Sequence, residues 1–185
     1  FSMIDHGLAY VDETPRETMA LMRGDFHHPG TPSADRDMEP SIHRARFEAM
    51  CTGAYAEGEA VLRCKLDLAH PNMIMRDPVI WRILNDKHPR LPHWTAFPTY
   101  DFAHPFCDLR DRIALSLCSL EFEDHKPFYN HVVETAIALG FGWDGRKGPI
   151  GLEFARLEPS IGATSKRTLK EWVESGAVTG WDDPR

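Results

Sequence analysis

Residues 60–69 read AVLRCKLDLA, and apolar and polar side chains alternate along this stretch. One set would face the core, and it consists of Leu62, Cys64, Leu66 and Leu68; the other set is Val61, Arg63, Lys65 and Asp67. A period of two is typical of a strand with one buried face. We therefore expect a half-buried β-strand here, and this is the clearest strand signal in the chain.

The segments on either side of this strand predict an antiparallel sheet with helices packed on it. Downstream, residues 73–86 predict a pair of strands broken at Pro78, and residues 93–103 predict another strand. Upstream, residues 41–52 predict a helix with an imperfect apolar stripe, made of Ile42, Ala45, Phe47, Ala49 and Met50.

The first forty residues predict a strand or turn over 2–10, a short helix and a long loop. Thr14 fits the N-cap of this helix, Pro15 its first turn and Glu17 the third position of a capping box. Gly24 would end the helix, and the proline-rich residues 25–40 would form the loop.

From residue 104 onward, helices and short apolar elements alternate. We expect a helix, a short apolar element, a second helix over 126–139, a glycine-rich loop over 140–151 and a strand over 152–157. Residues 165–176 predict a last helix, closed by Gly176.

The composition indicates a globular protein, with 42% hydrophobic and 26% charged residues among 185. No apolar run approaches the roughly 20 residues that span a bilayer, so we expect no membrane segment. The first residues, FSMIDHGLAY, lack the features of a signal peptide. The four cysteines form no C-x-x-C pair, which argues against a zinc site and favours reduced thiols in the cytoplasm. We therefore expect no metal site built from protein ligands.

The net charge of −7 argues against general affinity for nucleic acid, but a local face could still bind it.

Eight segments together resemble the class I glutaminyl-tRNA synthetases, in that family's order and near its spacing. They are GLAYVDETP, RGDFHHPG, VLRCKLDLAHPNMIMRDPVIWRI, FPTYDFAHPFCD, SLCSLEFEDHKPFYN, LEFARL, TSKR and GWDDPR.

The resemblance implies an α/β fold in three parts. Residues 1–99 would form the acceptor-binding domain, an α+β domain with an antiparallel sheet. Residues 100–157 would form the second half of a Rossmann-like catalytic domain with a parallel sheet. Residues 158–185 would hold a KMSKS-like loop and the start of a helical stem-contact region. The HxGH signature of the family is absent from the sequence, and we expect it upstream of Phe1.

The resemblance also implies ATP, with Mg²⁺, as a substrate. It places Ser165 and Lys166 of TSKR on the phosphates, where a lysine supplies a compact charge. Arg156 would contact ATP, the Leu157 backbone would bind the adenine, and His104 would lie by the ribose. The alternatives are a solvated helix N-terminus at 165–167 and a surface ion pair for Arg156. Thr164 stands where the family usually has methionine.

For the amino acid, the resemblance implicates Tyr100, Cys118 and Phe122. A tyrosine hydroxyl both donates and accepts, so it can read the neutral amide of glutamine. Simple packing in the core would explain the same residues. Two positions depart from the family pattern: Gly151 replaces a glutamine, and Arg112 replaces a glycine.

For tRNA, the resemblance implicates Phe26, Pro71, Met73 and Asp124. Phe26 would press against the first acceptor base pair, and Asp124 would accept from a guanine amino group in the minor groove. Pro71 and Met73 would contact the groove through their backbone. Phe26 could instead anchor its loop, and Asp124 could be a plain surface charge.

The function that the resemblance implies is ATP-dependent activation of glutamine and its ligation to the acceptor end of tRNA(Gln), by a monomer. Two alternatives stay open. One is the archaeal/eukaryotic type of glutamyl-tRNA synthetase, which typically has an arginine at the position of Cys118. The other is a non-catalytic structural or interaction subunit derived from such a synthetase. Because the HxGH half is missing, we expect these 185 residues alone to be inactive.

Overall fold

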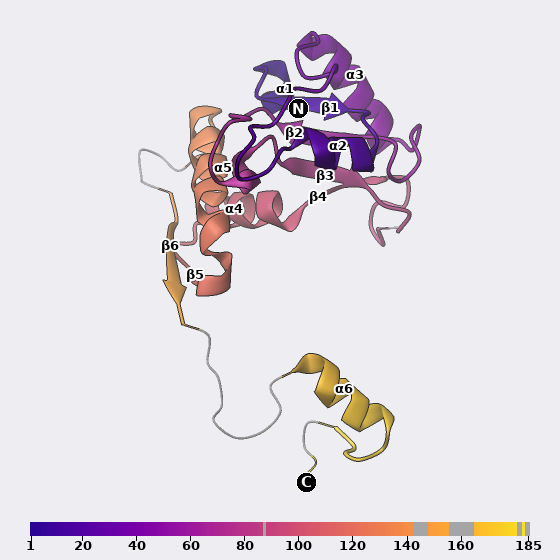
Figure 1. Ribbon diagram of the computed structural model, residues 1–185, viewed down its shortest axis with the longest axis vertical. Coiled ribbons are helices and arrows are strands. Elements are labelled where there is room, and N and C mark those ends of the chain that lie inside the picture. Colours follow the sequence, from indigo (N-terminus) through magenta and orange to yellow (C-terminus); the bar gives the residue numbers. More distant parts are fainter. Residues whose placement is uncertain (87, 143–147, 156–164, 181–182, 184–185) are drawn as a thin grey trace. The chain divides into compact units, whose positions relative to one another are not determined.

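The computed structural model describes residues 1–86, 88–142, 148–155, 165–180 and 183. They form two compact units, Phe1–Glu153 and Phe154–Arg185. The first unit contains a four-stranded sheet, and Figure 1 shows helices against it. Its strands follow the order β1 (Ala9–Asp12), β2 (Val61–Cys64), β3 (Val79–Ile83) and β4 (Ala96–Pro98), and every neighbouring pair is antiparallel. The predicted antiparallel sheet is therefore confirmed.

Three helices precede or interrupt this sheet: α1 (Ser2–Asp5), α2 (Arg16–Met22) and α3 (Pro40–Cys51). The helix expected over 41–52 is confirmed as α3, but only part of its expected stripe is buried. Phe47 and Met50 lie in the core, whereas Ile42 is 42% exposed. His43 takes the buried position between Ile42 and Phe47, because its ring accepts a hydrogen bond from the backbone of β1.

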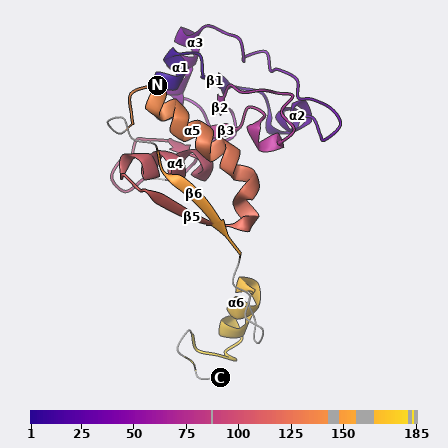
Figure 2. The same cartoon turned by 90° about the vertical axis from the view of Figure 1, so that its left-hand side faces the viewer.

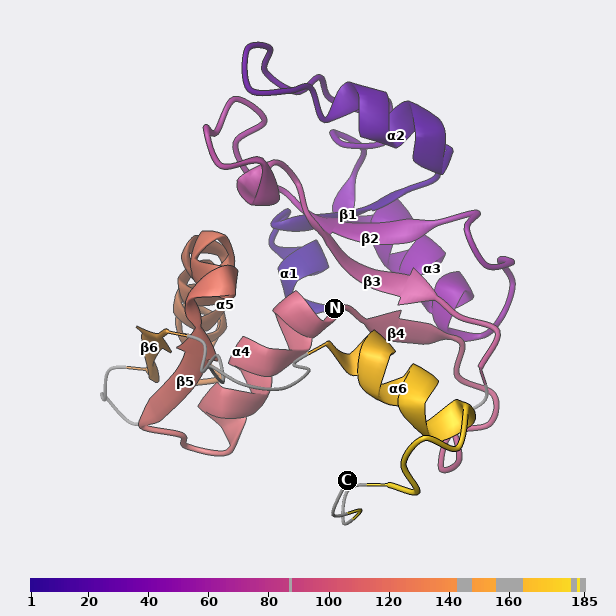
Figure 3. The same ribbon diagram turned by 60° about the horizontal axis from the view of Figure 1, so that its bottom comes forward.

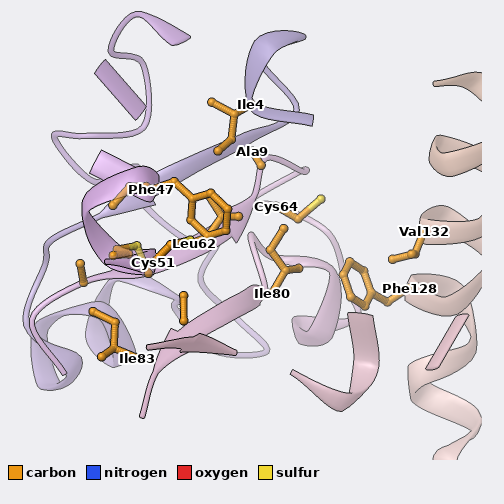
Figure 4. Packing of buried hydrophobic residues seen from close by; sticks show 14 residues of the cluster. Ile4, Ala9, Phe47, Cys51, Leu62, Cys64, Ile80, Ile83, Phe128 and Val132 are labelled. Atoms are coloured by element: carbon orange, nitrogen blue, oxygen red, sulfur yellow. The ribbon is translucent and has the colours of Figure 1, made fainter. Parts of the chain in front are cut away.

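The hydrophobic core continues beyond the sheet into the later part of the first unit. Figure 4 shows Phe47, Leu62 and Ile80 packed together, with Phe128 and Val132 reaching the cluster from a further helix, α5 (Lys126–Ala138). Burying these side chains contributes roughly 1.5–3 kcal/mol each. The core therefore fixes α5 against the sheet.

The remaining elements of the first unit are α4 (Tyr100–Arg110), β5 (Leu115–Ser119), the 3₁₀-helix η2 (Leu120–His125) and β6 (Ile150–Phe154), whose last residue belongs to the second unit. The β5 and β6 strands run parallel, and the Ile150 N–H donates to the Ala114 carbonyl over 3.1 Å (Figure 2). Helices α4 and α5 pack together around Leu109 and Val133. The expected α/β fold, with an antiparallel sheet followed by a parallel strand layer, is confirmed.

A strand or turn is expected over residues 2–10, but Ser2–Asp5 form the helix α1. Four further local expectations are wrong. Thr14 does not cap α2, whose N-cap is Pro15 without a side-chain hydrogen bond; the Thr14 N–H donates to Asp12 Oδ1 instead. Residues 73–75 form a 3₁₀-helix, η1 (Met73–Met75), because the Asn72 side chain accepts from the Ile74 N–H and favours a turn over a strand. The strand expected over 93–103 is short, and Tyr100 begins a helix.

The fourth error concerns β2, which is buried on both faces. Arg63 is only 4% exposed, so the strand is not half solvated. Its guanidinium donates to Asp12 Oδ2 and to the Asp77 carbonyl, both over 2.7 Å. An arginine that finds such acceptors can be buried, and alternation alone does not reveal them.

The second unit contains α6 (Lys166–Glu174), with Ser165 as N-cap and Gly176 following in the left-handed conformation (φ +73°). The predicted last helix and its glycine are confirmed. Among the described residues, no helix is long and apolar enough to cross a membrane.

Candidate functional site

A pocket of about 390 Å³ lies among α4, β5, η2, α5 and β6. This volume is within the range of small-molecule sites. Four of the residues that the sequence singled out line it together: Tyr100, His104, Cys118 and Phe122. Gly151 also lines it.

Local periodicity explains how these side chains meet. Tyr100 and His104 lie four residues apart on α4, and their rings stack with centroids 5.2 Å apart. On β5, Ser116 and Cys118 point to the covered side, whereas Leu117 is 62% exposed. The pocket therefore lies where one helix face meets one face of the parallel strands.

The ring of His104 is fixed by two polar neighbours. Its Nε2 lies 3.1 Å from Ser116 Oγ and 3.1 Å from Asp108 Oδ2. The Tyr129 hydroxyl donates to Asp108 Oδ2 over 2.8 Å. Burial, and next the hydrogen bond to Asp108, raise the pKa of Tyr129, so this residue stays a neutral donor.

The acidic and basic side chains at the pocket are paired with one another. His125 Nδ1 lies 3.0 Å from Asp101 Oδ1, and Lys126 Nζ lies 2.7 Å from Glu153 Oε2. Within the described part of the lining, Lys126 is the sole lysine or arginine. The pocket therefore offers hydroxyl, thiol and aromatic groups to a ligand, and no unpaired lysine or arginine.

The two departures from the family pattern differ in their relation to the pocket. A Cβ on Gly151 would meet nothing within 4 Å, so the glycine leaves open space in the lining. Arg112 is not among the described lining residues. It occupies the turn after α4 with φ +60°, a conformation that glycine adopts more easily.

The residues proposed for tRNA lie on three segments, two of which are joined directly. Pro71 and Met73 flank Asn72, whose Nδ2 donates to the Asp124 carbonyl over 2.7 Å. Phe26 lies in the loop after α2, 84% exposed. Figure 3 shows this loop beside the η1 segment.

The residues proposed for ATP are divided between the two units. His104 lines the pocket of the first unit. Ser165 and Lys166 begin α6 in the second unit, and both are exposed. Arg156, Leu157 and Thr164 lie outside the described residues.

Sequence reasoning missed several pocket residues, among them Ser116, Tyr129 and Glu153. It also missed Asp108, which contacts His104 and Tyr129 of the lining. Asp108 follows His104 by four residues in a helical segment, and this spacing was the available signal. Glu153 follows Gly151 by two residues in a strand, so both face the same side.

Similar proteins are known over the whole length of the chain. The family model described as "tRNA synthetases class I (E and Q), catalytic domain" matches residues 1–185. The chain is 44% identical to a protein of Cupriavidus metallidurans over 185 residues, which is 100% of this chain and 31% of that relative. Proteins of Ralstonia pickettii and Actinobacillus succinogenes are each 44% identical over 184 residues, which is 99% of this chain and 32% of each relative.

All three relatives are named glutamine–tRNA ligase, and the chain spans about a third of their length. The match to the family model covers every residue, and it accords with the α/β fold and with the parallel strands beside the pocket. The chain belongs to the catalytic-domain family of the class I tRNA synthetases for glutamate and glutamine.

Proposed function

We propose that the protein containing this chain is a glutaminyl-tRNA synthetase. It would activate glutamine with ATP and Mg²⁺ and transfer it to the acceptor end of tRNA(Gln). The observation that carries this proposal is the pocket in which Tyr100, His104, Cys118 and Phe122 come together. The names of the relatives support the same assignment.

The charges of the pocket favour glutamine over glutamate. A bound carboxylate needs a cationic partner once water is excluded. Lys126 is already paired with Glu153, and Cys118 contributes a thiol where a cation would be needed. The side-chain amide of glutamine can instead use the Tyr100 hydroxyl as donor or acceptor.

The first chemical step would form an aminoacyl adenylate. A carboxylate oxygen of glutamine attacks the α-phosphorus of ATP. The bond between the α-phosphorus and the oxygen that bridges the α- and β-phosphates breaks, and pyrophosphate leaves. Negative charge on the phosphates would be met by Lys166, with Ser165 beside it, while Arg156 and the Leu157 backbone would hold the nucleotide. His104 would lie by the ribose. In the second step a terminal hydroxyl of the tRNA attacks the acyl carbon, and AMP leaves.

The division of the chain would follow these roles. Residues 1–99 would bind the acceptor end, residues 100–157 would form the second half of the Rossmann-like domain, and residues 158–185 would hold the KMSKS-like loop and the start of the stem-contact region. Phe26, Pro71, Met73 and Asp124 would contact the tRNA. We further propose that the enzyme acts as a monomer in the cytoplasm.

The test is ATP–pyrophosphate exchange and tRNA charging by the full-length protein, with glutamine and glutamate compared. We expect faster exchange with glutamine. Faster exchange with glutamate would assign the protein to the glutamyl enzymes, and exchange with neither would indicate a non-catalytic subunit.

A pair of lysine variants tests the role of the second unit. Lys166→Ala should reduce exchange by about a hundredfold or more, because one donor to the developing charge is lost. Lys170→Ala is the matched control: this lysine lies on the same helix and pairs with Glu174. Equal effects of the two substitutions would contradict a role on the phosphates.

A further inference from the structure

The loop of residues 23–30 combines an exposed aromatic side chain with a closely fixed backbone. Phe26 is 84% exposed, although a phenylalanine is normally buried. Gly24 has φ +74°, and a Cβ there would lie 2.4 Å from the His28 carbonyl oxygen. This close approach is open only to glycine, so the loop is folded tightly on itself.

Hydrogen bonds hold the loop from inside and at its end. The Asp25 carboxylate Oδ1 accepts from the His27 N–H over 2.7 Å and from the His28 N–H over 2.9 Å. The Gly30 N–H donates to the Leu68 carbonyl and the Thr31 N–H to the Met22 carbonyl, each over 2.7 Å. The backbone around Phe26 therefore has few alternative conformations.

One buried side chain connects this loop to the segment that follows β2. Arg76 is 3% exposed, and its Nη1 donates to three loop carbonyls: Arg23 over 3.1 Å, Asp25 over 2.9 Å and His28 over 3.0 Å. Its Nε donates to the His70 carbonyl over 2.7 Å. A guanidinium with this many acceptors orders every group that it contacts.

We propose that Arg76 is a positioning residue that holds the 23–30 loop so that Phe26 is presented to the end of the acceptor stem. This inference rests on the proposed function. Arg76 does not touch the tRNA itself; it fixes the carbonyls on both sides of Phe26, and an aromatic ring held in one place stacks on a base with less loss of entropy.

The same arginine relates the loop to the other proposed tRNA contacts. Arg76 is the C-cap of η1, directly after Met73–Met75, and Asn72 at the other end of η1 binds the Asp124 carbonyl. The segments that carry Phe26, Met73 and Asp124 are thus linked by hydrogen bonds from two polar side chains, Arg76 and Asn72. Loss of Arg76 would release Phe26 and leave the bond from Asn72 to Asp124 in place.

The test measures KM for tRNA and KM for glutamine in the full-length protein. Arg76→Met should raise KM for tRNA by about tenfold and leave KM for glutamine unchanged. Asp25→Ala, which loosens the loop from its exposed side, should do the same and avoids the risk of misfolding. The matched control is Arg82→Met, at an exposed arginine of β3, which should change neither constant.

A double variant separates positioning from a general loss of structure. Phe26→Ala should raise KM for tRNA, and adding Asp25→Ala to it should have little further effect, because the loop then has no ring to present. Additive effects, or an unchanged KM for tRNA in both Arg76→Met and Asp25→Ala, would overturn the proposal.

Hydrogen exchange tests the inference without activity. In Arg76→Met the amides of 25–31 should exchange about tenfold faster than in the unsubstituted protein, while α3 stays protected. Unchanged exchange in the loop would overturn the role of Arg76. If the unsubstituted protein charges no tRNA with glutamine, the proposed function fails, and the exchange experiment still decides whether Arg76 holds the loop.

Discussion

On α4, His104 and Asp108 form one unit: Nε2 of the histidine lies 3.1 Å from Oδ2 of the aspartate. The same carboxylate oxygen accepts from the Tyr129 hydroxyl over 2.8 Å. One carboxylate therefore fixes two aromatic rings of the pocket, one from α4 and one from α5. A rigid pocket positions its ligand better than one whose side chains move.

Replacing this carboxylate should impair the reaction without unfolding the protein. In Asp108→Asn the amide oxygen can still accept a hydrogen bond from Tyr129 or His104, but the negative charge is lost. We expect kcat/KM for tRNA charging to fall about tenfold. The control is Asp111→Asn at the exposed end of the same helix, where the aspartate pairs with Arg110. If both variants behave alike, Asp108 has no role in ordering the pocket.

Much of the fold follows from local sequence. The apolar positions of residues 40–51 and 126–138 have helical spacing, and short apolar segments in the first hundred residues predict the strands of the antiparallel sheet. Burial of charged groups could not be predicted in this way. Arg63 and Asp77 look like solvent-facing residues until Tyr10, Asp12 and their other partners are brought together across the sequence.

The parallel strands show a second limit of pattern reasoning. Leu115 and Leu117 alternate with Ser116 and Cys118, and the usual rule would bury the leucines. In the first unit the leucines are 49% and 62% exposed, and the small polar residues face α4 and α5. Ser116 and Cys118 line the pocket from the covered side of β5, and Leu117 also reaches its lining. Family resemblance indicated the pocket residues where periodicity would have misled.

A cation in the pocket should change its preference for the amino acid. Cys118→Arg would add a positive charge opposite a glutamate side chain, so exchange with glutamate should rise relative to glutamine by about tenfold or more. Cys118→Ser keeps a small neutral group and should preserve the preference for glutamine. The ratio of the two exchange rates in each variant is the measurement; no shift in the arginine variant would argue against an amide-reading pocket.

The four thiols should differ in their reaction with an alkylating reagent. Burial raises the pKa of Cys51 to about 11 and that of Cys64 to about 12, so few of these thiols are ionised at pH 8. Cys107 and Cys118 are partly exposed and should react first. Glutamine should slow the labelling of Cys118 and leave that of Cys107 unchanged. Mass spectrometry of the labelled peptides reads out each site, and early labelling of Cys64 would contradict its burial.

Loss of the buried charge at Asp77 should destabilise the first unit. This carboxylate is 0% exposed and accepts from the Tyr10 hydroxyl, Arg36 Nε and the Leu66 N–H. Asp77→Asn retains the shape and tolerates the local φ of +44°, but it removes the buried anion of Arg36 and leaves the exposed Asp37, 3.8 Å away, at a cost of about 3 kcal/mol. Denaturant unfolding measures the change. Asp111→Asn, at the exposed partner of Arg110, should be indistinguishable from the unsubstituted protein.

Stability should fall in mild acid because His43 is buried in its neutral form. The Val11 N–H donates to His43 Nδ1 over 3.2 Å, and burial lowers the pKa of this histidine below its ordinary value of 6.5. Between the two pKa values, His43 is therefore protonated in the unfolded chain and neutral in the folded chain. The free energy of unfolding then decreases as the pH drops below about 6.5, by up to ~1.4 kcal/mol per unit until the folded-state pKa is reached.

Comparing denaturant unfolding at pH 7.5 and pH 5.5 checks this sign. His43→Gln removes the titrating group and should reduce the loss of stability between the two pH values, even though the glutamine lowers stability at both. The exposed His6 offers the control, and His6→Gln should retain the full loss. A loss of stability in His43→Gln as large as that of the unsubstituted protein would contradict the role of His43. That result would assign the acid response to other groups. His131 is one such group, because burial also lowers its pKa.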